Sequence, residues 1–166
     1  MLTLPKIVER KPQPYVGIRR TVSIPFGSVV DATMPKLFQW LGAHGIEPAG
    51  PPFFKYNVID MAKGLEIEFA VPTATLLQPD DTVVVGTLPA GRYATLTFHG
   101  HYDKLMDATA VLIGWAKERG VAWDSEMTPA GEKFAARFEV FPNDPREVPN
   151  PDDWETEIWI KTRDGA

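Results

Sequence analysis

Apolar and polar residues alternate over six stretches of the chain, as they do in half-buried β-strands. The stretches in the first half are 15–24 (YVGIRRTVSI), 53–60 (FFKYNVID) and 65–72 (LEIEFAVP), and those in the second half are 82–98, 133–141 and 155–162. Helices are expected over about 28–43 and 102–119, between the first and second strand of each half. The pattern therefore predicts the same order of elements in both halves.

The ends of the two helices carry residues that favour helix capping. The second helix presents one apolar stripe, formed by Leu105, Ala108, Leu112 and Trp115. Asp103 is its expected N-cap, and Gly120 follows it as a C-cap glycine. Ser28 is the expected N-cap of the first helix, where Pro35 predicts a kink or a later start.

The chain also repeats itself in sequence. LFQWLGAHGIE at 37–47 and LIGWAKERGVA at 112–122 share a leucine, a tryptophan and a glycine at an offset of 75, and Pro14 and Pro89 match at the same offset. We therefore predict one α+β domain with a duplicated β-α-β-β unit: repeat one at about 5–73, a linker at 74–81 and repeat two at about 82–163. Such a unit predicts an antiparallel sheet with both helices on one face. Trp40 and Trp115 are expected to pack under the sheet, and a ligand cleft is expected at the pseudo-twofold axis on the sheet's other face.

Composition and charge exclude several classes of protein. Hydrophobic residues make up 44% of the chain and charged residues 23%, which is typical of a globular domain. The net charge is −5 and no basic cluster exceeds the pair Arg19–Arg20, so direct nucleic-acid binding is not expected. No apolar run is long enough for a membrane helix, and the first residues lack the layout of a secretory signal. Because the chain has no cysteine either, we expect a cytoplasmic protein with no membrane partner.

One strand places a carboxylate among aromatic residues. In 133–141, Arg137, Glu139 and Phe141 share one strand face, and Phe138 and Val140 share the other. A carboxylate that faces an apolar cleft is costly to ionise unless a cation accompanies it. We therefore expect Glu139 to meet a bound cation, with Arg137 as the alternative partner within the chain. The competing interpretation is a solvated strand glutamate.

Metal and cofactor chemistry find little support in the sequence. His99 and His101 have a spacing compatible with a metal, and Asp103 is near them, but no third strong ligand accompanies them. The chain contains neither a G-x-S-x-G nucleophile motif nor a glycine-rich phosphate loop. We expect no metal and no cofactor.

Several segments resemble the GyrI-like small-molecule-binding domains, which are also the effector-binding domains of certain AraC-type and MerR-type multidrug regulators. The matching segments are LPAGRYATLTFHGHYDKL, GPPFFKYNV, LEIEFAVP and FEVFPNDPREVPNPDDWETEIWI, and the resemblance covers about 5–163. It implies the duplicated fold and a cleft for amphipathic, often cationic, aromatic molecules, with Glu139 as the charge partner. Rings near the cleft would stack on such ligands, and Glu68 would add a second negative charge. The expected ligand-binding residues are Glu139, Tyr93, Tyr56, Trp154, Phe54, Phe141, Arg137 and Glu68.

Three functions stay open at this point. The first is a standalone binding protein that senses or sequesters these molecules, because too few residues precede the first strand for a helix-turn-helix. The second is a hydrolase that opens strained cyclopropane rings with Glu139 as general base. The family often has tyrosine where this chain has Phe141, so Tyr93 or Tyr56 would have to supply the missing hydroxyl. The third is an interaction module that inhibits a protein partner.

Overall fold

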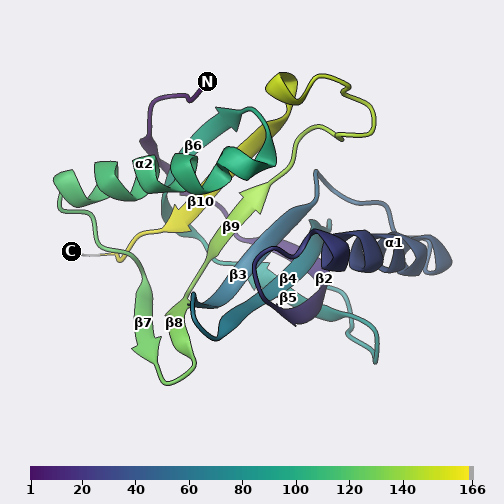
Figure 1. The fold of residues 1–166 in the computed structure, drawn as a ribbon. Coiled ribbons are helices and arrows are strands. Elements are labelled where there is room, and N and C mark those ends of the chain that lie inside the picture. The colour runs from purple at the N-terminus through teal and green to yellow at the C-terminus, as the bar shows by residue number, and fades with distance from the viewer. Residues whose placement is uncertain (165–166) are drawn as a thin grey trace.

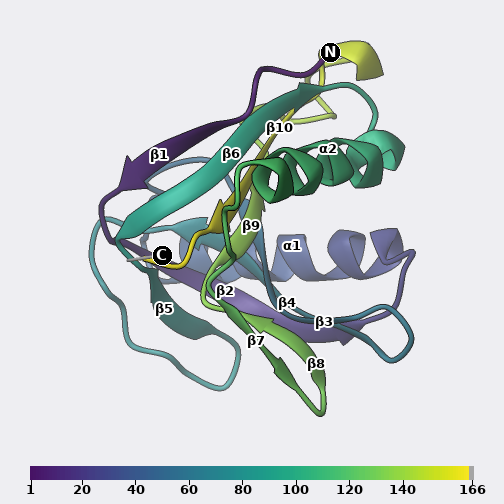
Figure 2. The ribbon, with the colours of Figure 1, turned by 90° about the vertical axis from the view of Figure 1, so that its left-hand side faces the viewer.

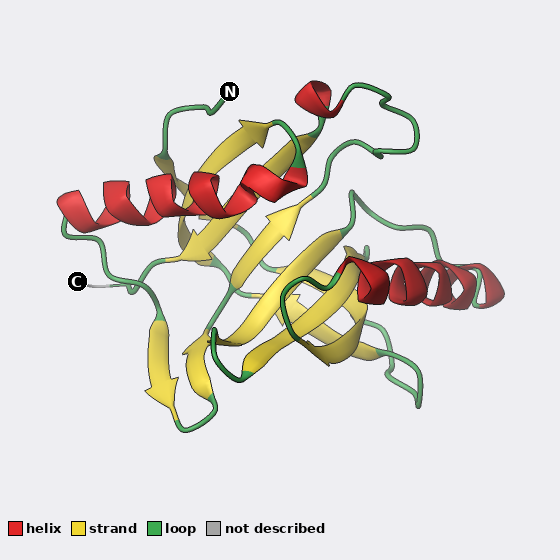
Figure 3. Ribbon diagram, viewed as in Figure 1, coloured by secondary structure: helices red, strands yellow, loops and turns green. Residues whose placement is uncertain are grey.

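The computed structural model describes residues 1–164, which form one antiparallel sheet and two α-helices (Figures 1 and 3). The strands are β1 (Lys6–Arg10), β2 (Gln13–Val22), β3 (Phe53–Asp60), β4 (Gly64–Pro72), β5 (Val84–Leu88), β6 (Gly91–His99), β7 (Ser125–Thr128), β8 (Gly131–Phe134), β9 (Arg137–Val140) and β10 (Glu155–Lys161). The helices are α1 (Gly27–Ala43) and α2 (Leu105–Glu118), with short 3₁₀ turns η1 (Tyr102–Lys104) and η2 (Pro151–Asp153). The predicted α+β class is confirmed.

The order of the strands is symmetric about the centre of the sheet. It runs β1-β6-β10-β9-β3-β4-β2-β5, so that β9 and β3 lie in the middle. β1 precedes β2 in the chain but pairs with β6, and β5 precedes β6 but pairs with β2. The two halves therefore exchange their first strands, and backbone hydrogen bonds of the exchanged strands tie the halves together near both sheet edges.

Two of the predicted strands are each divided in two. The stretch 82–98 forms β5 and β6, which a short turn separates. Gly91, the first residue of β6, has a φ of +144°, which glycine adopts more readily than other residues. The stretch 133–141 forms β8 and β9, because the N–H of Ala135 donates to the carbonyl of Asp124 instead of continuing a ladder. β8 pairs with β7 in a hairpin that the pattern did not predict, and β1 was not predicted either.

The helices end as predicted but begin differently. Gly45 and Gly120 follow them with φ values of +65° and +67°, as C-cap glycines do. α1 begins at Gly27, so Ser28 is not its N-cap, and Pro35 lies inside it without delaying its start. Asp103 is not the N-cap of α2 either, since it lies within η1, where its N–H donates to the His101 ring. Neither helix in the described residues is long and apolar enough to cross a membrane.

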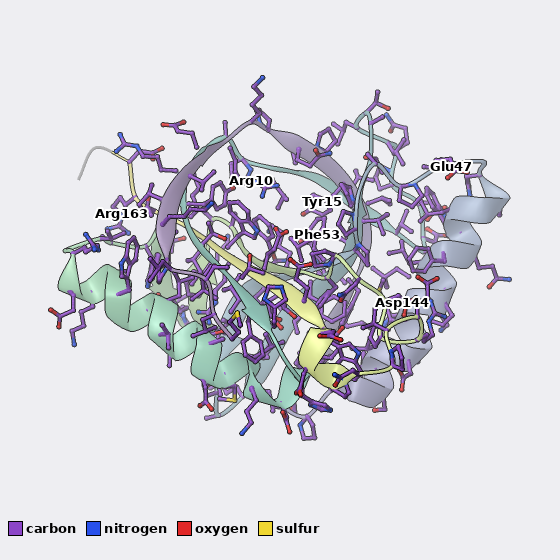
Figure 4. All side chains as sticks on the ribbon, turned by 90° about the horizontal axis from the view of Figure 1, so that it is seen from above. Arg10, Tyr15, Glu47, Phe53, Asp144 and Arg163 are labelled. Atoms are coloured by element: carbon purple, nitrogen blue, oxygen red, sulfur yellow. The ribbon has the colours of Figure 1, made fainter. Side chains whose placement is uncertain are left out.

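Both helices cover the same face of the sheet, and the sheet curls away from them (Figure 2). α1 packs on β2 and β4 through Leu37 and Leu41, and α2 packs on β6 and β10 through Leu112. Trp40 and Trp115 are partly buried against these two cores, as expected. The inner face of the curve has a separate core, which includes Tyr15, Phe53, Leu88, Tyr93, Phe138 and Trp159. Figure 4 shows Tyr15, Phe53 and Arg10 within this curve.

Candidate functional site

The middle of the sheet carries the residues that the sequence singled out. β3 and β9 lie between the two helices in Figure 1, and Phe54 pairs directly with Glu139 at their junction. Phe54 and Tyr56 pack against the cluster of Phe69 and the α1 side chains, so they lie on the helix-bearing face. Glu139 is on this face too, since Tyr56 donates its hydroxyl to it. We call this group, with Phe141, the central site.

A carboxylate–phenol pair forms the polar half of the central site. The Tyr56 hydroxyl lies 2.5 Å from Oε1 of Glu139. Burial raises the pKa of Glu139, and the Tyr56 hydrogen bond and the charge of Arg137 only partly oppose this effect. Burial and the neighbouring carboxylate likewise raise the pKa of Tyr56 well above its ordinary value. The pair is thus a half-buried carboxyl group that a phenol holds in one orientation.

The apolar half of the central site lies at the positions that the pseudo-twofold axis relates to those of the polar half. Tyr56 comes two residues after Phe54, and Phe141 comes two residues after Glu139. The Phe54 and Phe141 ring centroids are 4.6 Å apart, and the N–H of Phe141 donates to the carbonyl of Pro52. The pseudo-twofold therefore relates a polar Glu139–Tyr56 pair to an apolar Phe54–Phe141 pair, which gives the site an amphipathic character.

A row of aromatic rings continues from Phe141 along the loop after β9. The ring centroids of Phe141 and Tyr102 are 5.6 Å apart, those of Tyr102 and Trp154 4.8 Å, and those of Trp154 and His101 5.1 Å. Hydrogen bonds within the loop hold Trp154, whose indole N–H donates to the carbonyl of Val148. Burial raises the pKa of Tyr102 to about 12.

Sequence reasoning missed Tyr102 and His101 as members of this row. They belong to the segment HGHY at 99–102, whose histidines suggest a metal site in the sequence and whose rings are not among the expected ligand-binding residues. Within residues 1–164 no group of three or more potential metal ligands comes together. The aromatic character of HGHY, next to a predicted helix start, was the available signal.

Two of the expected ligand-binding residues lie on the opposite face of the sheet. Tyr93 is fully buried in the inner core and donates its hydroxyl to the carbonyl of Pro89. Glu68 is 3% exposed and accepts hydrogen bonds from Tyr15 and Asn57. The expectation that both join Glu139 in one cleft, on the face away from the helices, is therefore wrong. The alternation along each strand was right, but the helices cover the face of Glu139.

Arg137 lies on the face of Glu139 but does not pair with it. Its guanidinium carbon is 4.9 Å from the ring centroid of Phe134. Within residues 1–164 its side chain makes no hydrogen bond and no ion pair; Tyr56 holds the Glu139 carboxylate instead. Burial lowers the pKa of Arg137, and the charge of Glu139 partly offsets this shift.

A surface hollow of about 320 Å³ opens where the β2–α1 loop, the β3–β4 turn and the start of α2 meet. Three exposed apolar side chains line it, those of Ile24, Met61 and Met106. Asp60, the last residue of β3, also lines the hollow, but none of its lining residues belongs to the central site. Exposed methionines adapt readily to apolar groups of varied shape.

Comparison with known proteins identifies related sequences and folds. The sequence model of the GyrI-like small-molecule-binding domain matches residues 4–163, whereas no curated protein matches. The C-terminal domain of EcmrR is 17% identical with a TM-score of 0.75, and the match covers 96% of this chain and 97% of that domain. In a DNA complex of EcmrR, the chain spans 57% of the regulator's length.

Two further structures share the fold. SAV2435, solved with bound tetraphenylphosphonium, is 12% identical with a TM-score of 0.57, and the match covers 98% of this chain and 95% of that one. A hydrolase from Listeria innocua is 10% identical with a TM-score of 0.64, and the match covers 96% and 91%. At these identities the similarity shows the fold alone.

Proposed function

The chain belongs to the family of GyrI-like small-molecule-binding domains, and we propose that it binds amphipathic aromatic cations at its central site. Sensing or sequestration of such compounds is the role that follows. The Glu139–Tyr56 pair carries this proposal, because it is a half-buried carboxyl group flanked by the packed rings of Phe54 and Phe141.

The Glu139 carboxylate is costly to ionise in its half-buried position. Its raised pKa means that ionisation is less favourable in the folded protein than for an exposed glutamate. A lipophilic cation would supply the missing counter-charge without the desolvation cost of a small hydrated ion. The ligand's aromatic groups would contact Phe54, Phe141 and the ring row through Tyr102 and Trp154. The fold relative SAV2435 was solved with an ion of this kind, tetraphenylphosphonium.

The test uses two ions of nearly equal shape and opposite charge, tetraphenylphosphonium and tetraphenylborate. By calorimetry we expect the cation to bind with micromolar affinity, about −8 kcal/mol, and the anion to bind far more weakly. Glu139→Gln keeps the shape and removes the charge, so cation binding should weaken by about 1.5–3 kcal/mol.

Glu157→Gln is the matched control. Glu157 belongs to the same sheet and its carboxylate accepts a hydrogen bond from the indole of Trp159 in the inner core. This variant changes the net charge by the same amount on the opposite face, so it should leave the affinity for the cation unchanged. Equal losses in the two glutamine variants would mean that the ion responds only to overall charge, and the proposal would fail.

A hydrolase function is the second candidate, and the Tyr56 contact favours it. A hydrolase without tyrosine at position 141 needs another hydroxyl at Glu139, and the Tyr56 hydroxyl is hydrogen-bonded to that carboxylate. Glu139 would take a proton from water while the phenol oxygen holds that water in place. Incubation with a cyclopropane-bearing alkylator, followed by mass spectrometry, tests this. Ring-opened product that accumulates over many turnovers and is lost in Glu139→Gln would support hydrolysis; stoichiometric binding without product would exclude it.

A broad multidrug range and a cytoplasmic location stay predictions.

A further inference from the structure

Arg137 supplies a second charged group to the central site. It is two residues from Glu139 on β9, and therefore on the same strand face. Lys55 pairs with Phe138 at the end of the β3–β9 ladder, and Tyr56 and Arg137 are the next residues of the two strands, close enough for the charge of Arg137 to act on the phenol. The positive side chain thus borders the same phenol that holds the Glu139 carboxylate.

This guanidinium is half-buried, and its N–H donors have no hydrogen-bond partner within residues 1–164. Burial lowers its pKa, and its contact with the Phe134 ring stacks the guanidinium without satisfying its N–H donors. Within residues 1–164 it makes no ion pair with Glu139 or with Glu132, whose Oε2 accepts a hydrogen bond from Ser125. A planar guanidinium with free donors is suited to bind a carboxylate through two parallel hydrogen bonds.

The central site therefore presents one negative and one positive group side by side, which influence each other's pKa but form no direct ion pair. A simple cation gains attraction from Glu139 but also meets repulsion from Arg137. A molecule with both charges matches the two groups together.

We infer that the ligands of this protein are zwitterionic, with a carboxylate or similar compact anion attached to the cationic aromatic group, and that Arg137 binds that anion. This inference rests on the proposed function, because it assigns the ligand class of the same site. It makes Arg137 a residue that determines specificity, while the aromatic rings bind the ligand body in either case.

Rhodamine 6G and its free acid test the inference, since they share one cationic ring system and differ only in an ethyl ester or a carboxylate. Fluorescence anisotropy at pH 7.5 should show the zwitterionic acid binding about ten-fold more tightly than the ester. Arg137→Met keeps much of the side-chain volume and removes the charge, so it should abolish this preference. Glu139→Gln should weaken both dyes.

Arg119→Met is the matched control, because the Arg119 guanidinium is also stacked on an indole, 4.8 Å from the ring centroid of Trp115, but outside the central site. The ratio of the two affinities should not change in this variant. The inference would be overturned if the wild-type protein bound the ester as tightly as the acid, and this comparison does not depend on the folding of Arg137→Met. It would also be overturned if folded Arg137→Met still preferred the acid. Tight binding of the ester alone would leave the proposed function standing, whereas no binding of either dye would overturn both.

Discussion

Glu68 should be essential for the stability of the fold rather than for ligand binding. It is buried on the inner face, where Oε2 accepts hydrogen bonds from Tyr15 at 2.9 Å and Asn57 at 3.0 Å. Lys55 lies 3.5 Å away as its ion-pair partner and Arg19 lies 3.7 Å away. Glu68→Ala removes the shared acceptor of this network, leaves the buried Tyr15 hydroxyl and the half-buried Asn57 amide without this partner, and leaves the Lys55 charge less compensated.

The expected cost follows from these contacts. Burial already lowers the pKa of Lys55, and Glu68 is the main group that opposes this shift. Removing one member of a buried ion pair typically costs about 3–5 kcal/mol. For a domain of this size, this corresponds to a fall in Tm of roughly 6–20 °C. Tyr15→Phe removes one hydrogen bond and should cost only about 1 kcal/mol.

Urea denaturation followed by circular dichroism measures these differences. Adding Lys55→Met to Glu68→Ala should recover part of the loss, because it removes the uncompensated charge. Tetraphenylphosphonium binding by the folded variants should stay at the wild-type level, since Glu68 faces away from the central site. A loss of less than about 1 kcal/mol in the free energy of unfolding of Glu68→Ala would refute the reasoning, because removal of a network essential for stability should have a larger effect.

Two further predictions concern other charged groups. Because the pKa of Glu139 is raised, affinity for tetraphenylphosphonium, whose charge does not vary with pH, should be full above that pKa and fall as pH decreases through it, starting at a higher pH than for an ordinary glutamate. Calorimetry between pH 4.5 and 8 measures this, and a pH dependence that persists in Glu139→Gln would contradict it. On the inner face, Arg10 stacks 4.3 Å from the ring centroid of Trp159, and the symmetric position on β5 holds Leu88. Arg10→Ala should therefore lower the free energy of unfolding by about 1–2 kcal/mol, and Arg10→Leu should lower it clearly less. Urea denaturation measures both losses, and equal losses would show that the packing of the side chain contributes nothing.

Much of the fold was predictable because its signals are local. Alternation identified β3 over 53–60, where the ladder with β4 forms, and the repeated glycines at 45 and 120 marked both helix ends. The division of 133–141 into β8 and β9 was not predictable in this way. It depends on the Asp124 carbonyl, which comes from a segment outside the predicted strand. The start of α1 at Gly27 likewise has no side-chain cap to announce it.

The candidate site was predictable only in part, for the same reason. Strand periodicity alone placed Arg137, Glu139 and Phe141 on one face, and the structure brings them together with Tyr56 and Phe54. Side chains alternate with the same two-residue period on both faces of a sheet, however, so the period does not indicate which face the helices cover. That choice depends on long-range contacts such as those of α1 with Phe69, and it separated Tyr93 and Glu68 from Glu139.

The sequence by itself determined the repeat, the β-α-β-β order within each half and the grouping of residues on each strand, because these follow from spacing along the chain. Only the tertiary structure decided that β1 and β5 exchange between the halves and that a carboxylate–phenol pair stands opposite a pair of phenylalanines. Both features arise where segments from different repeats meet across the pseudo-twofold. The Tyr56–Glu139 hydrogen bond, for example, joins residues 83 positions apart, so no local pattern in the chain specifies it.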